Sequence, residues 1–484
     1  MPILAIGLCL ASGYLLIAMS WPRQKTSPSE LVMKLSLSTG VGLGIFSVTF
    51  FVARLLGLTH LVEVDCSLLL SLLIIYFLRR PRTPVRAHGP EYEDFDLPVW
   101  VRYVLTASWL MAVSAALYNA ILRAAVHPHG EGWDAFAIWN LHARFLFLGG
   151  THWQDGFSPI IPWSHPDYPL LLPAAIAHFW SYLGHDDPSV AAIVGLAFTC
   201  STLALLVSSV ALLRGHVAAM LAGLALASTP FFIEQGTSQY ADVPVSFFIL
   251  ASVVLLHLGH RSQDGHDNSS GALILAGLAA GFAAWTKNEG LLFLFAFVIA
   301  QLWAFAGRPS QDTTRNPSVR SWPVWGHVLL GSAPILLLIV WFKYSVATPG
   351  DLFSSPATMI HKALTPSRYW IIVQWYAKEL LRFGGWWVLP GTVAMVAFYI
   401  LAPRHQRATR DPILHTLVTA LALTLAGYFA IYLITPRDLY WHLRFSLNRL
   451  FLQLWPGVVF LFFLVAGRQF SQTESNSGPK ESIC

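Results

Sequence analysis

The chain has 484 residues, of which 55% are hydrophobic and only 11% are charged, and its formal net charge is +5. Soluble domains carry roughly 25% charged residues, so this composition excludes a water-soluble globular protein. Lipid requires every backbone polar group to be paired internally, and apolar runs of roughly 17–25 residues suit helices rather than short alternating strands. We therefore expect an all-α integral membrane protein. Its positive charge indicates topology, so binding to nucleic acid is not expected.

In chain order, the apolar runs predict about thirteen transmembrane helices. The expected spans are residues 3–20, 31–58, 59–78, 99–123, 189–213, 217–233, 243–259, 271–286, 290–306, 323–345, 386–402, 412–434 and 451–467. The span at 59–78 is the least regular, because Glu63 and Asp65 interrupt its first turns.

Positive charges in the turns favour one orientation throughout. Arg23 and Lys25 follow the first span, and the other turns expected inside also carry arginine. These arginines are Arg79, Arg80, Arg82, Arg86, Arg214, Arg261, Arg308, Arg315, Arg320, Arg404, Arg407 and Arg410. Because Lys and Arg concentrate in cytoplasmic loops, we expect the N-terminus outside. The polar tail is then expected to be cytoplasmic and disordered.

The segments expected outside are rich in Trp, Tyr, His and Pro. They are residues 124–188, 234–242, 346–385 and 435–450. Trp and Tyr favour the membrane interface, where a ring is half buried and its polar tip is hydrated. We therefore expect helices that lie on the membrane surface. Their ranges are 133–148, 169–183 and 367–383.

Two outer carboxylates are candidates for acid–base chemistry. Asp134 follows Trp133, and partial desolvation among aromatic rings would strengthen this carboxylate as a base. A helix-capping role would suit the same position. Asp242 precedes Pro244 at the start of a span and has the same two interpretations. We assign both aspartates to the catalytic set.

The outer motif at residues 165–170 holds His165, Asp167 and Tyr168, and its two prolines fix a loop that enters a helix. These side chains would face the same cavity as Asp134, and an ordinary turn with a capping Asp is the alternative. We assign His165 to catalysis, and Asp167 and Tyr168 to substrate binding.

Basic residues on the outer side indicate an anion, because the topology rule does not expect them there. Lys287 lies in the turn Thr286–Gly290, where it would either pair with Glu289 or face a phosphate. The last outer segment carries Arg437, Arg444 and Arg449. Arginine binds phosphate through parallel hydrogen bonds, so we assign these residues and Lys287 to a donor phosphate, with lipid headgroups as the alternative. The remaining substrate-binding candidates are Tyr240, Glu289, Trp441 and His442.

The first large outer segment contains five histidines, which raises the question of a metal site. They are His127, His129, His142, His152 and His165. Their spacings fit no standard site, so we assign no metal ligands and no cofactor, and a divalent metal is the open alternative.

Four short motifs follow one another along the chain. They are Asp134, the Tyr-Pro-Leu at 168–170, the Asp-x-Pro at 242–244 and the Thr-Lys-x-x-Gly at 286–290. In this order they resemble bacterial GT-C membrane glycosyltransferases, over roughly residues 97–467. The relatives are the RgtA/B/C/D-like transferases, the protein O-mannosyltransferases and the aminoarabinose transferase of lipid A modification. The motifs are individually unspecific, and their order carries the resemblance.

The resemblance implies a GT-C bundle and a hexosyl- or pentosyltransferase that faces the outside of a bacterial inner membrane. It implies a polyprenyl-phosphate sugar as donor, and a lipid, glycan or protein acceptor among membrane lipids. Asp134 matches the catalytic acidic position of the family and Asp242 its second acidic position. Relatives often have Lys-Pro-Pro at the position of residues 165–169, and this chain has no lysine there. His165 or Lys287 would then take over the role of that lysine.

The resemblance also predicts a division of the chain. Residues 1–96 would be an N-terminal extension of three spans, 97–467 the catalytic core and 468–484 the tail. Two other functions are consistent with a membrane bundle. A flippase or transporter of lipid-linked sugars would place ionisable residues at the bilayer midplane, where this sequence has few. A non-catalytic subunit with the same fold would be expected to lack the outer carboxylates, which are present.

Overall fold

The computed structural model describes residues 1–20, 27–79, 97–261, 269–306, 323–350, 355–385, 395–396, 398–399 and 412–466. Within these ranges every regular element is a helix, which confirms the all-α prediction. The first helices are α1 (Pro2–Ser20), α2 (Pro28–Leu55), α3 (Leu61–Arg79), α4 (Val99–Val126), α5 (Asn140–Leu148), α6 (Leu171–Leu183), α7 (Pro188–Arg214), α8 (His216–Ala227) and α9 (Pro230–Thr237). The others are α10 (Asp242–Arg261), α11 (Ser269–Thr286), α12 (Asn288–Ala306), α13 (Val324–Ser345), α14 (Pro356–Ala363), α15 (Pro366–Arg382), α17 (Pro412–Ile434) and α18 (Leu439–Ala466).

Among the described residues, 10 helices are long and apolar enough to cross a membrane. The bent pair α8 and α9 raises this number to 11 if it forms one span. The chain is thus an integral multi-pass membrane protein, but the predicted thirteen spans are not confirmed. The expected span 386–402, most of the basic turns that set the orientation, and the tail 468–484 lie outside the described residues.

The predicted span at 217–233 is broken by a bend. α8 ends at Ala227, and α9 begins at Pro230 after a bend of 65°. Proline disfavours the helical conformation of the residue before it, and Thr229 accordingly adopts an extended backbone with φ −87° and ψ 101°. The break places α9 at an angle that leads the chain into the turn before α10.

Most of the predicted outer segment 435–450 is helical, because α18 begins at Leu439, before the expected start of the last span at residue 451. The Asp438 carboxylate accepts a 2.8 Å hydrogen bond from the Trp441 backbone N–H, which caps this helix end. Arg444 and Arg449, which are expected on the outer side, therefore lie on the same helix as the last span.

The N-terminal helices pack into the bundle rather than beside it. A Cβ added to Gly40 on α2 would lie 2.0 Å from the Phe247 ring of α10, so these helices are in direct contact. α3 is tied to α6 through Asp65, whose carboxylate lies 2.8 Å from His178 and accepts a 2.6 Å hydrogen bond from Tyr182. Pairing of this kind explains how a span containing Asp65 is tolerated.

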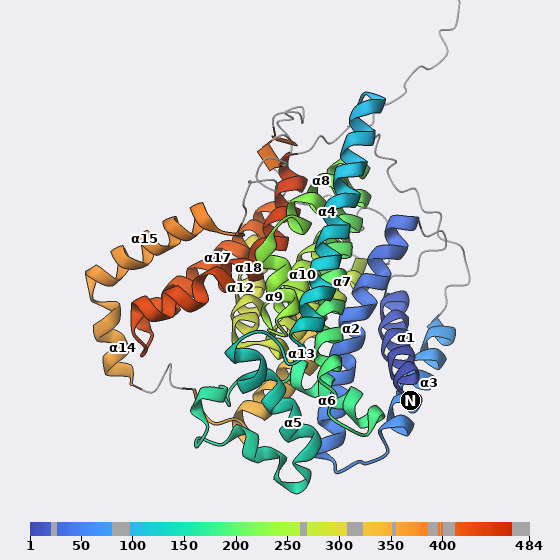
Figure 1. Cartoon of the computed structure of the whole chain (residues 1–484), viewed down its shortest axis with the longest axis vertical. Helices are drawn as coiled ribbons and strands as arrows, with labels where there is room; N and C mark the ends of the chain where they lie inside the picture. The colour runs from blue at the N-terminus through green and yellow to red at the C-terminus, as the bar shows by residue number, and fades with distance from the viewer. Residues whose placement is uncertain are drawn as a thin grey trace, which may run out of the picture.

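The predicted surface helices form at nearly the expected positions. The first is a π-helix, η1 (Ala135–Trp139), that continues into α5, and α6 and α15 are the others. α5 and α6 lie at the end of the bundle where the N-terminus lies, whereas α14 and α15 stand beside α17 (Figure 1). α6 is buried along most of its length against α2 and α5, so it is part of the bundle rather than a helix lying on a surface.

Candidate active site

Asp242, the first residue of α10, is fully buried at the centre of a polar cluster. Its Oδ1 accepts hydrogen bonds from Lys287 Nζ at 3.0 Å and from Gln453 Nε2 at 2.7 Å. Its Oδ2 accepts from Arg449 Nε at 2.8 Å. An isolated buried charge would be very costly, so these partners are what allow the carboxylate to be buried.

Arg449 of α18 joins both predicted catalytic aspartates. Its Nη2 lies 2.8 Å from Asp242 Oδ2, and its Nη1 lies 2.7 Å from Asp134 Oδ2. The guanidinium carbon also lies 4.7 Å from the centre of the Tyr240 ring. The predicted phosphate ligand Arg449 is therefore paired with two carboxylates in this structure.

Asp134 is the residue before η1, and its side chain caps no helix hydrogen bond. The capping alternative thus does not describe Asp134 here. The chain reaches Asp134 through Gly132, which has φ +89°, and a Cβ at Gly132 would lie 2.5 Å from the Tyr240 hydroxyl oxygen. Glycine is required at position 132 for both reasons, and it lets the loop place Asp134 against Arg449.

Lys287 lies in the turn between α11 and α12. Its Nζ is 3.0 Å from Asp242 Oδ1 and 3.0 Å from Glu289 Oε1. Burial opposes the charged amine, but Asp242 and Glu289 outweigh it and raise the pKa of Lys287 above its ordinary value. The predicted Lys287–Glu289 pair is present, and Glu289 Oε2 is buried without a hydrogen-bond partner in the described part of the chain.

A second polar cluster surrounds Asp167. Asn288 Nδ2 donates to Asp167 Oδ2 at 2.7 Å, and Lys343 Nζ donates to Asn288 Oδ1 at 2.7 Å. Lys343 also donates to the Asp167 backbone carbonyl and lies 3.6 Å from Asp167 Oδ2. Because Asn288 lies between Lys287 and Glu289 in the chain, one turn connects both clusters.

His165 has a left-handed backbone, with φ 51°. Its ring stacks on Tyr168 with centres 4.5 Å apart, and Tyr168 stacks on Trp139 at 5.5 Å. Burial and the nearby charge of Arg437 lower the pKa of His165 below its ordinary value, and Asp167 opposes them. The lowered pKa favours the neutral ring of His165 at pH 7, and a neutral imidazole can accept or donate one proton.

The other predicted residues near the start of α18 include two arginines that contact aromatic rings. The Arg437 guanidinium is 5.6 Å from the Trp441 ring, and that of Arg444 is 5.7 Å from the Phe445 ring. His442 Nδ1 lies 2.9 Å from Thr435 Oγ1. Arg444 and Trp441 are exposed, and the contacts of Arg444 are not with the carboxylates described above.

Three cluster residues were missed by the sequence analysis: Asn288, Lys343 and Gln453. Gln453 links Asp242 to the Tyr428 hydroxyl, which donates to Gln453 Oε1 at 2.8 Å. The available signal was that each is a polar residue within or beside an apolar run, where an unpaired polar group is costly. In the described ranges no three His, Cys, Asp or Glu side chains are arranged to hold a metal ion.

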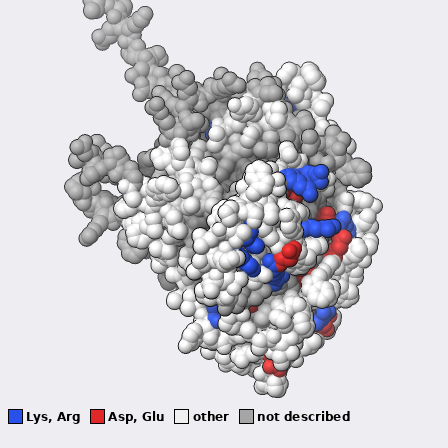
Figure 2. Space-filling view, turned by 90° about the vertical axis from the view of Figure 1, so that its left-hand side faces the viewer, with Lys and Arg blue, Asp and Glu red and all other residues white. Residues whose placement is uncertain are grey.

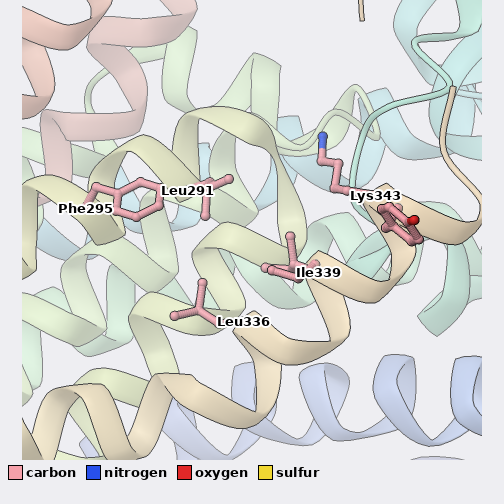
Figure 3. A pocket seen from close by; sticks show the side chains of 7 residues that line it. Leu291, Phe295, Leu336, Ile339 and Lys343 are labelled. Carbon is pink, nitrogen blue, oxygen red and sulfur yellow. The ribbon is translucent and has the colours of Figure 1, made fainter. Parts of the chain in front are cut away.

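Figure 2 shows acidic and basic side chains next to one another on the described surface of the molecule. An open apolar groove of ≈ 330 Å³ lies between α12 and α13 (Figure 3). Leu291, Phe295, Leu336 and Ile339 are among its walls, and Lys343 stands at one end with its amine directed away from them (Figure 3). The groove therefore leads from the apolar surface to the second polar cluster.

Residues 164–341 match the family model described as dolichyl-phosphate-mannose-protein mannosyltransferase. The match covers less than half of the chain, and over this segment it supports a likeness to GT-C glycosyltransferases. Searches against curated proteins and against solved structures gave no match. The helical bundle described above agrees with the all-α membrane architecture of the GT-C type.

The segment that matches this family model contains much of the polar site. It includes His165 and Asp167 before α6, Asp242 at the start of α10, and Lys287 in the turn after α11. Asp134 lies before it and Arg449 after it, so the ion-pair bridge joins this segment to two other parts of the chain.

Proposed function

We propose that the protein transfers a hexosyl or pentosyl group from a polyprenyl-phosphate carrier to an acceptor hydroxyl on the outer face of the membrane. The observation that carries this proposal is the Asp134–Arg449–Asp242 bridge at one end of the bundle. It combines a partly exposed carboxylate, suited to act as a base, with cations suited to a phosphate. The membrane would be a bacterial inner membrane. The catalytic core would comprise residues 97–467. Residues 1–96 would form an N-terminal extension, and residues 468–484 a cytoplasmic tail.

The apolar groove between α12 and α13 supports a lipid-linked donor. It faces the apolar surface, since Phe295 and Val340 on its walls are more than half exposed. A prenyl chain in the groove would place its head group near Lys343 and the turn at 287–289. The family's name refers to a sugar carried on dolichyl phosphate, which belongs to this class of donors.

In the proposed reaction Asp134 takes the proton from the acceptor hydroxyl as its oxygen attacks the anomeric carbon. The bond between that carbon and the carrier phosphate oxygen breaks, and its electron pair leaves with the phosphate. In-line attack inverts the anomeric centre. The leaving phosphate is a stable anion, so it needs no proton, and the electrostatic contribution of nearby cations is what lowers the barrier.

The remaining residues have supporting roles in this proposal. Lys287 and Arg449 would stabilise the phosphate, and Arg437 and Arg444 would be further cations for it. His165 and Asp167 would position hydroxyl groups, and the buried Asp242 would hold Arg449 and Lys287 in place. The aromatic and polar groups of Tyr168, Tyr240, Glu289, Trp441 and His442 would bind the sugar or the acceptor.

Transfer activity in proteoliposomes tests the proposal. Wild-type protein is supplied with a panel of radiolabelled polyprenyl-phosphate sugars, and the label is followed into membrane and soluble acceptors. Asp134→Asn should lower transfer by about 10²–10⁴-fold while the protein stays folded.

The matched control is Asp186→Asn, which also removes a carboxylate from an arginine, here Arg144 at 3.0 Å. It should keep wild-type activity. Retained transfer in Asp134→Asn would exclude Asp134 as the base. Movement of the labelled lipid across the bilayer without transfer to any acceptor would instead favour the flippase.

A further inference from the structure

The cation that should hold the donor phosphate already holds the candidate base. Arg449 uses Nε and Nη2 on Asp242, and Nη1 on Asp134. A carboxylate oxygen that accepts a charge-assisted hydrogen bond from a guanidinium has one acceptor site fewer for an incoming hydroxyl group. Asp134 in this structure is therefore engaged with Arg449 and not free for an acceptor.

The two carboxylates differ in how easily a ligand can replace them. Asp242 is fully buried and also accepts from Lys287 and Gln453. The Asp134 side chain is 23% exposed, and its contact in the cluster is with Arg449. The Asp242 side of the bridge is thus anchored, and Asp134 is the partner that an incoming anion can reach.

The cluster has no surplus of positive charge. Asp134, Asp242 and Glu289 surround Arg449 and Lys287. A phosphate that entered next to Asp134 would meet a like charge, and a phosphate that replaced Asp134 at Arg449 would gain a charge-assisted hydrogen bond.

The backbone near Asp134 is suited to such an exchange. Asp134 precedes η1, a single π-helical turn, and follows a loop in which Gly130 and Gly132 have positive φ. Single π-turns interrupt the regular hydrogen-bond ladder of a helix and are frequent at functional sites. A rotamer change at Asp134 would break its pair with Arg449 without disturbing the buried half of the bridge.

We propose that the phosphate of the lipid-linked donor displaces Asp134 from Arg449, so that donor binding releases the base for the acceptor. This inference rests on the proposed transferase function. Transfer then puts the acceptor proton on Asp134 and additional negative charge on the leaving phosphate. Arg449 favours the phosphate until the carrier leaves, and Asp134 returns to Arg449 after losing its proton. The donor therefore binds before the acceptor.

The test measures the affinity of a polyprenyl monophosphate for the full chain in nanodiscs of zwitterionic lipid. If Asp134 competes with phosphate for Arg449, Asp134→Asn should bind the probe about tenfold more tightly than wild type, although it cannot transfer sugar. Asp186→Asn, which relieves Arg144 instead, should bind as wild type does.

A double variant separates direct competition from general electrostatics. In an Arg449→Lys background the single amine cannot hold both carboxylates, so Asp134→Asn should give little further gain. An equal gain in both backgrounds, or an affinity of Asp134→Asn equal to or below that of wild type, would overturn the displacement. The transferase function would survive either result if Asp134→Asn also abolished transfer. Absence of specific binding in wild type, with only bulk phospholipid retained, would overturn both.

Discussion

Gln453 donates a 2.7 Å hydrogen bond to the buried carboxylate of Asp242 from an otherwise apolar stretch of α18. The same side chain accepts from the Tyr428 hydroxyl, so it closes the inner side of the cluster. One amide thereby connects the ion-pair bridge to α17. Its place inside the bundle explains why the bridge has one anchored carboxylate and one replaceable carboxylate.

Replacement of Gln453 by leucine should destabilise the protein. Asp242 would lose a charge-assisted hydrogen bond, which is worth about 1.5–3 kcal/mol, and the Tyr428 hydroxyl would lose its acceptor. The thermal midpoint in a fixed detergent measures the effect. The control is Gln301→Leu on α12, because Gln301 Nε2 donates within its own helix and Oε1 has no partner in the described structure. Equal losses in both variants would contradict the assigned role of Gln453.

Gly132→Ala should misplace Asp134. The new Cβ would meet the Tyr240 hydroxyl at 2.5 Å on a backbone with φ +89°, and together these effects should cost about 1–3 kcal/mol and most of the transfer activity. Gly150 also has a positive φ, +55°, but no atom lies within 4 Å of a Cβ added there. Gly150→Ala should therefore show the cost of the backbone conformation alone. Adding Tyr240→Phe to Gly132→Ala should restore part of the stability. No rescue, or equal effects at both glycines, would count against the close contact.

The neutral state of His165 predicts a dependence of stability on pH. Its pKa is lowered, so the stability that it contributes is present above the unfolded-state pKa of about 6.5 and is lost as pH falls through the lower folded-state pKa. His165→Gln should flatten part of the decline in thermal midpoint as the pH falls below about 6.5. His142 is buried and its pKa is lowered to about 3, so it also lowers the stability as the pH falls. The quantity to compare is therefore the difference in thermal midpoint between His165→Gln and wild type at each pH.

His152→Gln is the control for that measurement, because the His152 side chain is 82% exposed. It should leave the pH profile unchanged. A His165→Gln profile that runs parallel to wild type through this range would show that His165 is not buried as a neutral ring.

The sequence predicts the site's residue types better than their partners. Asp134, Asp242 and Lys287 are recognisable because carboxylates and amines at the ends of apolar runs are few. That Arg449 joins the two aspartates depends on packing between α10, α18 and the π-turn, residues far apart in the chain. No local pattern encodes such a contact, so the phosphate assignment of Arg449 could be made but its present ion pairs could not.

The missed residues have a similar explanation. Gln453 is one polar residue in an apolar run, and Lys343 at a helix end looks like a residue that only reaches toward the interface. The early start of α18 was missed because its first turns are polar, so hydropathy alone begins the span too late. The bend at Thr229 and Pro230 had a local signal, but the apolar composition on both sides outweighed it.

Filling the groove between α12 and α13 should weaken donor use without changing the chemistry. Leu336→Trp places a larger side chain in the groove beside Leu291 and Ile339 (Figure 3). If the prenyl chain lies there, KM for the lipid-linked donor should rise about tenfold while kcat changes little, because the contact is made equally before and during the reaction. The control is Leu337→Trp, which adds the same ring at a neighbouring position of α13 that is 71% exposed and does not line the groove. Steady-state transfer at varied donor mole fraction in mixed micelles gives both constants. A fall in kcat at unchanged KM, or equal effects of the two tryptophans, would assign the prenyl chain to another surface and leave the groove as a feature of helix packing.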